Sequence, residues 1–456
     1  MDFNYERKNV YKEADGKELE AIYDYAEGYK KFLNASKTER DAAKTAEKMA
    51  LERGYTPFSF DEKLKAGDKR YFINRNKNVF LIKVGTEDIA ENGVRIMVAH
   101  VDSPRLDLKP NPMYEDSGLC YFKTHYYGGI KKYQWTALPL ALHGVVMLRG
   151  GERVEVCVGE DEDDPVFYIT DILPHLASEQ ASKPVSKAVS GESLNAVIGG
   201  LPSVGEEEEK EAVKAAVLRL LNKKYNMTEV DLQCSELCFV PAGKARDVGF
   251  DASLISAYGH DDKVCAYPEM CALFDSEQSP HTIIAIFSDK EEVGSDGATG
   301  AQSRVICDVI DTISASFGVN PVVVRYNSKC ISADVTAGFD PEYASAYEKR
   351  NSCYIHCGAA VSKYTGSRGK SGTNDAGAEF TGWLRDVFEE NGVIWQMGEL
   401  GAIDVGGGGT VAKYFANLGV DTIDVGVPVL SMHAPYELIS KADVYALYKA
   451  CLAFCK

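Results

Sequence analysis

Several features that would assign a sequence directly to a class of protein are missing here. No run of 18 or more apolar residues occurs, so we expect no membrane-spanning helix. The first residues, MDFNYERKNVYKEADGKE, are charged throughout and have no apolar core, so we expect no secretory signal. None of the 12 cysteines forms a CxxC pair, which disfavours a structural zinc site with cysteine ligands.

Basic residues are also scarce. Lys and Arg number 50 against 68 Asp and Glu, which gives a net charge of −18. Nucleic acids and anionic membranes attract basic surfaces, so neither is expected as a partner. The cysteines are scattered through apolar segments, which predicts buried, reduced thiols and a cytoplasmic location. A chain of 456 residues predicts two to three domains, or one large domain with an insertion.

The segment TIIAIFSDKEEVGSDGATG, residues 282–300, combines a buried strand with adjacent acids. Its apolar, β-branched start predicts a parallel strand that is covered on both faces. Glu291 and Glu292 follow at the carboxyl end, where open α/β sheets place their ligands. If the segment stays extended, neighbouring side chains point to opposite sides, so Glu291 and Glu292 would face different partners, for instance a metal and a water molecule. A charged turn at the end of a strand is the alternative.

Comparable segments occur elsewhere in the chain. RIMVAHVDS, residues 95–103, predicts a strand that places His100 and Asp102 on one side, as a zinc ligand and the carboxylate that orients it. Asp261 and Asp262 precede a helix-compatible run, and a helix N-cap explains only one of them. Together these ligand types predict two zinc-class ions, one bridging carboxylate and one carboxylate acting as general base. The candidates are His100, Asp102, Asp261, Glu291, Glu292, Asp334 and His433.

The remaining pattern predicts the order of the elements. Helices are expected over about 11–34, 38–53, 210–226 and 375–391, and strands over 69–74, 79–85 and 95–103. The segment VVVRY, residues 322–326, predicts a further strand. Between Pro104 and Lys244, strand-like pieces alternate with turns, which indicates an inserted domain. Four consecutive glycines, Gly406–Gly409, could cradle a phosphate, but no GxxxxGK[ST] motif accompanies them, so a nucleotide-binding function is disfavoured.

Five of these segments resemble the aspartyl aminopeptidase / aminopeptidase I family of co-catalytic dizinc metallo-aminopeptidases. They are AHVDSPRLDLKP, HDDKVCAYPEMCAL, SDKEEVGSDGATGA, SADV and SMHAPYE. The resemblance implies an α/β fold in which helices sandwich a mixed sheet, the zinc exopeptidase fold. It implies a catalytic domain over 1–103 plus 246–456 and an inserted, β-rich dimerisation domain over 104–245. It also implies two Zn²⁺ per subunit, replaceable by Co²⁺ or Mn²⁺, and release of the amino-terminal residue from peptide substrates.

The resemblance also implies roles for individual residues. The metal ligands would be His100, Asp261, Glu292, Asp334 and His433, with Asp261 bridging, Glu291 as general base and Asp102 supporting the ligands. The segment ITDILPHLA resembles the part of the dimerisation domain in which a histidine, here His175, reaches a neighbouring subunit's active site and contacts the substrate. Lys363 stands where members that prefer acidic residues bind the substrate's side chain. A homo-oligomer, a dodecamer built from dimers, is implied as well.

The sequence departs from the family pattern at three places. The usual Leu-Asp-Asn around the bridging acid is His260-Asp261-Asp262 here, which leaves Asp262 as an alternative bridge. A second histidine expected after Asp334 is missing. The sequence around Lys363, AAVSKYTG, is also unlike that of the members that prefer acidic residues, so the preference for an acidic or a neutral amino-terminal residue stays open. The competing functions are a dizinc carboxypeptidase or amide deacylase of related fold, and a non-catalytic assembly protein.

Overall fold

Two strands from distant parts of the chain form the centre of the larger sheet. In the computed structural model, which describes residues 4–203, 210–277 and 279–456, β4 (Arg95–His100) pairs in parallel with β14 (Ile283–Ser288). The register places Ser288 opposite His100. The other neighbour of β14, β3 (Asn78–Lys83), runs antiparallel, so the sheet is mixed. It has nine strands in the order β1-β2-β3-β14-β4-β15-β21-β17-β19; the others are β1 (Thr56–Pro57), β2 (Lys69–Asn74), β15 (Lys329–Ser332), β17 (Ala359–Ser362), β19 (Trp395–Met397) and β21 (Asp421–Gly426).

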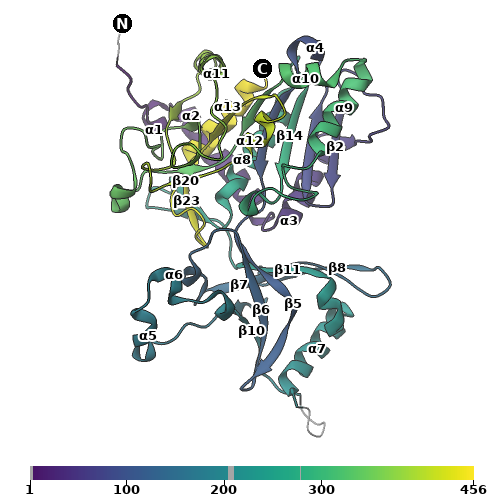
Figure 1. The fold of residues 1–456 in the computed structure, drawn as a ribbon, viewed down its shortest axis with the longest axis vertical. Coiled ribbons are helices and arrows are strands. Elements are labelled where there is room, and N and C mark those ends of the chain that lie inside the picture. The colour runs from purple at the N-terminus through teal and green to yellow at the C-terminus, as the bar shows by residue number, and fades with distance from the viewer. Residues whose placement is uncertain (1–3, 204–209, 278) are drawn as a thin grey trace. The chain divides into compact units, whose positions relative to one another are not determined.

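Side chains alternate along the central strands into two separate cores. Met97 and Ala99 of β4 lie in one hydrophobic cluster, whereas Ile96 and Val98 lie in the other. Helices cover both faces, which confirms the predicted sandwich (Figure 1). The first cluster includes residues of α2 (Gly16–Asn34), α3 (Glu39–Glu52), α8 (His260–Asp275), α11 (Ala378–Glu390) and α13 (Lys441–Phe454). The second includes residues of α4 (Ile89–Asn92), α9 (Val305–Phe317), α10 (Pro321–Asn327) and α12 (Ala412–Ala416).

Two of the predicted helices begin at residues whose side chains cap them. Asp15 accepts hydrogen bonds from the N–H groups of Lys17 and Glu18 at the start of α2. Thr38 and Asp41 form a capping box at the start of α3, as the break near residue 36 predicts. The helices predicted within 11–53, 210–226 and 375–391 are confirmed by the positions of α2, α3, α7 (Ala212–Tyr225) and α11.

The strand predicted at VVVRY is wrong, because this segment is helix α10. Pro321 occupies the first turn, where its missing N–H costs nothing, and the Asn320 side chain accepts the N–H of Val322. Val322 and Val323 are 48% and 41% exposed, so the three valines do not form a buried strand. The local capping signal outweighs the β-propensity of valine here.

A second compact unit comprises Ser103–Lys244 together with His433–Tyr436, and the first comprises the rest of the chain. Its seven-stranded sheet has the order β11-β5-β6-β10-β9-β7-β8, and every pairing in it is antiparallel. The strands are β5 (Arg105–Asp116), β6 (Leu119–Tyr127), β7 (Pro139–Met147), β8 (Arg153–Val158), β9 (Phe167–Tyr168), β10 (Ala196–Gly199) and β11 (Ser235–Pro241). Short helices α5 (Ser178–Ala181) and α6 (Val185–Ala188) and the longer α7 complete the unit.

Two predictions from composition can be compared with the structure. All 12 cysteines are free, and eight of them are buried, as expected for reduced thiols in apolar segments. Among the described residues, no single helix is long and apolar enough to cross a membrane; α9 and α10 meet those criteria only as a pair, bent by 112° at the break between them.

Candidate metal centre

Imidazole and carboxylate groups converge where β4, β15 and α8 approach one another. His100 is the last residue of β4, Asp334 follows β15 by two residues, and Asp261 is the second residue of α8. His100 Nε2 lies 2.9 Å from Asp261 Oδ1 and 4.0 Å from Asp334 Oδ1. One ligand atom from each of the three residues lies within 4.8 Å of the others. Parallel strands thus bring these residues together at the sheet edge where ligands are expected.

The orientation of His100 is set by its other ring nitrogen. Nδ1 lies 2.9 Å from the backbone carbonyl oxygen of Asp102 and 3.4 Å from Asp102 Oδ1. A carbonyl oxygen only accepts hydrogen bonds, so Nδ1 carries a proton and donates it. Burial lowers the pKa of His100, but the carboxylates of Asp102 and Asp261 outweigh burial and raise that pKa well above its ordinary value. Asp102 thus contacts the His100 ring mainly through its backbone carbonyl, whereas the sequence predicted its carboxylate for this role.

Glu291 and Glu292 lie in a tight turn, so the expectation of an extended segment is wrong. Residues Glu291–Val293 form one turn of 3₁₀ helix, bounded by Lys290 and Gly294 in left-handed conformations. Asp102 holds this turn through both carboxylate oxygens. Its Oδ1 accepts the N–H of Glu291 at 3.1 Å, and its Oδ2 accepts the N–H of Glu292 at 3.2 Å. Successive side chains in a 3₁₀ turn diverge by about 120°.

The divergence gives the two glutamates different neighbours. Glu291 Oε2 lies 4.0 Å from His100 Nε2. Carboxylate oxygens of Glu292 and Asp261 lie within 4.8 Å of each other. Asp261 is therefore near His100, Asp334 and Glu292.

Asp262 faces a different direction from Asp261. Its Oδ2 accepts the backbone N–H of His100 at 3.3 Å, and the residue is fully buried. Burial raises the pKa of Asp262 well above its ordinary value, with a further contribution from Asp261. Asp262 belongs to neither group of ligand atoms around Asp261.

Two predicted site residues belong to the second unit. His433 has φ 63°, and its Nδ1 donates to the carbonyl oxygen of Gly129 at 2.8 Å, which leaves Nε2 as the nitrogen with the lone pair. It follows Met432 and precedes Glu437 by four residues, and both of these belong to the first unit. His175 lies on the 3₁₀ turn Pro174–Leu176 and is exposed.

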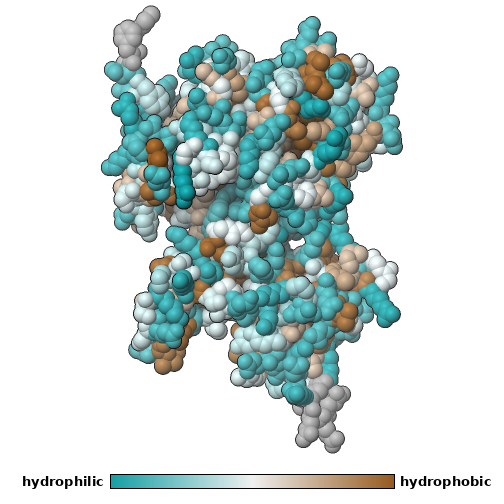
Figure 2. Space-filling model, viewed as in Figure 1, coloured by the Kyte–Doolittle hydropathy of each residue, from teal (hydrophilic) through white to brown (hydrophobic). Residues whose placement is uncertain are grey.

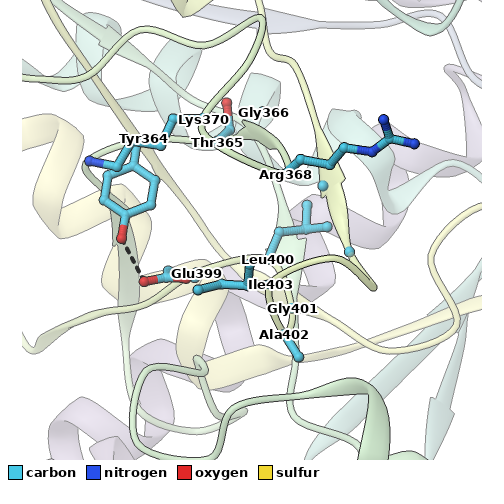
Figure 3. A pocket seen from close by; sticks show the side chains of 12 residues that line it. Tyr364, Thr365, Gly366, Arg368, Lys370, Glu399, Leu400, Gly401, Ala402 and Ile403 are labelled. Atoms are coloured by element: carbon cyan, nitrogen blue, oxygen red, sulfur yellow. Dashed lines mark hydrogen bonds between the residues drawn. The ribbon is translucent and has the colours of Figure 1, made fainter.

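Lys363 directly follows β17 and is partly exposed. Its neighbour Tyr364 lines a cavity, partly open to solvent, between the segments 364–370 and 399–407, and Lys363 does not line it (Figure 3). Tyr364 donates its hydroxyl to Glu399 at 2.6 Å, and this bond and burial raise the pKa of Tyr364 to about 12. The cavity therefore gives no support to the predicted role of Lys363.

One of the four consecutive glycines, Gly407, has a steric cause. Gly407 and Gly408 form β20, which pairs with β18 (Gly366–Ser367) along the wall of this cavity. Gly407 has φ +143°, and a Cβ there would lie 2.3 Å from the carbonyl oxygen of Gly366. The close approach of two backbones accounts for glycine at this position.

Glu437 is a residue of the site that the sequence pattern did not predict. Glu437, only 2% exposed, accepts the backbone N–H of Asp261 through Oε2 at 3.0 Å. It is the first residue of β23 (Glu437–Ser440), and β23 pairs with β13 (Leu254–Ala257). The sequence feature that could have indicated Glu437 is a single acidic residue at the start of a mainly buried strand.

The donor set fits zinc. Imidazole nitrogen and carboxylate oxygen are zinc ligands, and the three grouped residues supply one nitrogen and two carboxylates. No cysteine belongs to either group of candidate ligands among the described residues. Two carboxylates and one imidazole leave an excess of negative charge at the site, and a bound cation would balance it.

A mixed sheet between two helical layers, with such ligands at one edge, is the architecture of a zinc exopeptidase. The chain belongs to the M18 family: residues 32–455 match the family described as aminopeptidase I zinc metalloprotease (M18). A probable M18 family aminopeptidase 1 from Clostridium acetobutylicum is 47% identical, with 98% of each chain covered. The corresponding relative from Thermotoga maritima is 44% identical, again over 98% of each chain. The protein is thus an aminopeptidase of a zinc metalloprotease family.

Solved structures confirm the fold. The M18 aminopeptidase of Thermotoga maritima superposes with a TM-score of 0.95 at 42% identity, covering 99% of this chain and 100% of that one. Aminopeptidase I of Clostridium acetobutylicum gives 0.94 at 44% identity, with full coverage of both chains. The mApe1 dodecamer of S. cerevisiae is 20% identical with a TM-score of 0.77 over 94% of this chain and 96% of that one, which shows a common fold.

Proposed function

We propose that this aminopeptidase uses two zinc ions and Glu291 as general base to release the amino-terminal residue of a peptide. The observation that carries the proposal is the pair of hydrogen bonds from the backbone N–H groups of Glu291 and Glu292 to Asp102. One carboxylate thereby holds the turn that carries both glutamates, and Glu291 Oε2 lies 4.0 Å from His100 Nε2. His100 and Asp334 would hold one ion, Glu292 and His433 the other, and Asp261 both. Asp261, and not Asp262, fits the shared position, because Asp262 is turned toward the backbone of β4.

Zinc bound there would polarise the peptide carbonyl and lower the pKa of a water molecule toward about 7. Glu291 would accept the proton of that water at its carboxylate and later deliver it to the leaving amine. Asp102 would keep Glu291 and the ring of His100 in place, since it contacts both. The rigid turn between Lys290 and Gly294 limits how far the base can move.

We further propose that the second unit mediates dimer formation. His175 is flanked by side chains that expose apolar surface: Ile172 is 45%, Leu173 50% and Leu176 67% exposed. Figure 2 shows apolar side chains at the surface in the region of α5, which follows this turn. An association that buried them would let His175 contact substrate at a neighbouring subunit. The yeast protein of the same fold is a dodecamer, and we propose that this chain likewise forms a homo-oligomer, a dodecamer built from dimers.

Substrate preference is the finest part of the proposal. Lys363 carries the only argument for acidic amino-terminal residues, and it comes from the resemblance of the sequence. We propose that acidic residues are accepted, with neutral residues as the competing preference. Replacement of Lys363 with methionine would lower turnover of an aspartyl substrate more than that of a leucyl substrate.

Peptides with one blocked terminus test the proposal directly. An aminopeptidase cleaves a peptide whose carboxyl terminus is amidated and leaves one with an acetylated amino terminus intact. The opposite pattern would indicate a carboxypeptidase, and cleavage of the acetyl group itself would indicate an amide deacylase. Either result would overturn the proposal.

A further inference from the structure

His260, which immediately precedes Asp261, is fixed at both ring nitrogens. The residue is fully buried at the start of α8. Nε2 lies 3.1 Å from the carbonyl oxygen of Ile255 in β13, so Nε2 must carry the proton and donate it. Nδ1 then accepts, and the hydroxyl of Tyr29 in α2 lies 2.7 Å from it. The Tyr29 and His260 rings also stack, with centroids 5.7 Å apart.

Helix α8 itself does not hold Asp261. The backbone of Asp261 (φ −75°, ψ 107°) and of Asp262 (φ −121°, ψ 27°) departs from helical geometry. The first N–H groups of any helix also lack partners within the helix. The Asp261 N–H is instead held by Glu437 of β23. The position of the Asp261 carboxylate therefore depends on contacts from outside the helix.

We infer that Tyr29 and His260 are positioning residues for Asp261, acting as a hydrogen-bonded link from α2 through His260 to β13. His260 is covalently adjacent to Asp261, so a ring fixed at both nitrogens fixes one end of the Asp261 backbone, while Glu437 fixes its N–H. This inference rests on the proposed zinc site, because it assigns the link to the ligand shared by both ions. It extends the site to helix α2, which supplies none of the candidate ligands.

Loss of this link should change zinc binding as well as stability, whereas loss of an ordinary buried hydrogen bond should change stability alone. Removing the Tyr29 hydroxyl leaves the ring and its packing in place but releases one nitrogen of His260. If the link only stabilised the fold, its loss would lower the free energy of unfolding and leave zinc binding unchanged. If it positions Asp261, zinc affinity and kcat fall in the folded protein.

The experiment compares Tyr29→Phe with Tyr25→Phe, both prepared as the full chain loaded with zinc. Tyr25 lies one turn earlier on α2 and packs its ring against Tyr267, Tyr445 and Tyr448, while the hydrogen bond to His260 Nδ1 comes from Tyr29. Zinc affinity is measured by competition with a chromophoric chelator, together with kcat, KM and the free energy of unfolding. The absorption spectrum of the Co²⁺-substituted protein reports the geometry of the ligands.

We expect Tyr29→Phe to weaken the more loosely bound zinc by about tenfold to a hundredfold, the range for residues that support metal ligands. We also expect it to lower kcat more than it changes KM and to alter the Co²⁺ spectrum. Tyr25→Phe should leave all three unchanged. If Tyr29→Phe does not yield folded protein, His260→Leu, which removes both hydrogen bonds of the ring, provides the same comparison.

Zinc binding by Tyr29→Phe equal to that of the unaltered protein would overturn the inference, as would an equal loss in Tyr25→Phe. Zinc binding and peptide cleavage by the unaltered protein show whether the inference alone or also the proposed function is wrong. If the unaltered protein binds two zinc ions and cleaves peptides, only the role of the link is refuted. If it does neither, the proposed site itself is wrong.

Discussion

Glu291 lies close enough to His100 to act on a water molecule bound at the same site, and its own N–H is held by Asp102. Replacement with glutamine keeps the shape of the side chain but removes its ability to accept a proton. We expect Glu291→Gln to retain zinc content and thermal stability and to lose about 10²- to 10⁴-fold in kcat, the range for general base catalysis. Steady-state kinetics and elemental analysis of the same preparation check this. Turnover near that of the unaltered protein would exclude Glu291 as the base.

Asp102 uses both carboxylate oxygens to accept N–H groups of the glutamate turn. Asparagine would offer one oxygen and one NH₂ group, and the NH₂ group cannot accept an N–H. We therefore expect Asp102→Asn to reduce kcat or zinc affinity by about 10- to 100-fold. Kinetics at saturating zinc separate the two effects. An unaltered kcat together with unaltered zinc affinity would show that the turn is held by other contacts.

At the scale of single residues, the sequence predicts ligand types better than supporting contacts. His100 and Asp102 could be paired from a spacing of two residues, and Glu291 and Glu292 from their adjacency. Tyr29 and Glu437 could not be found this way, because their partners lie 231 and 176 positions away in the chain. The roles assigned to all of the candidate ligands, to Glu291 as base and to His175 and Lys363 remain predictions.

The pairing of β18 with β20 allows a test at the scale of elements. A Cβ on Gly407 would collide with the backbone of Gly366, and φ +143° is unfavourable for any other residue, whereas a Cβ on Gly408 would meet nothing within 4 Å. We expect Gly407→Ala to lower the free energy of unfolding by about 1–3 kcal/mol. Gly408→Ala, the matched control, should change it by less than about 0.5 kcal/mol. Urea denaturation measures both, and equal losses would contradict the proposed cause.

Helices and strands with a clear pattern of apolar residues could be predicted from the sequence. Segments whose structure depends on a local cap or turn could not. The buried strand ending at Ser288 and the helices around residues 16–52 have apolar patterns that dominate their surroundings. The segment 322–326 was misassigned because Asn320 and Pro321 start a helix despite three valines. The segment Glu291–Val293 is a turn and not the extended segment expected, because Lys290 and Gly294 adopt left-handed conformations. The spacing of residues does not predict these conformations.

At the scale of the whole molecule, association through the second unit has a direct test. An aspartate at Leu176 would place charge on the proposed dimer surface, and burying an unpaired charge is unfavourable. We expect Leu176→Asp to shift the protein toward monomers in sedimentation velocity experiments. Leu220→Asp is the matched control, since Leu220 is 66% exposed against 67% for Leu176, but lies on α7. Unchanged assembly of Leu176→Asp would place the dimer surface elsewhere.

The number of zinc ions that activity requires tests the central claim most directly. The chain stripped of metal by a chelator is titrated with zinc, while bound zinc and cleavage of a free-amino peptide are followed together. The dizinc account predicts an inactive apo-protein, and full activity when two zinc ions are bound per chain. Full activity at one zinc per chain, or activity that survives complete removal of metal, would contradict it.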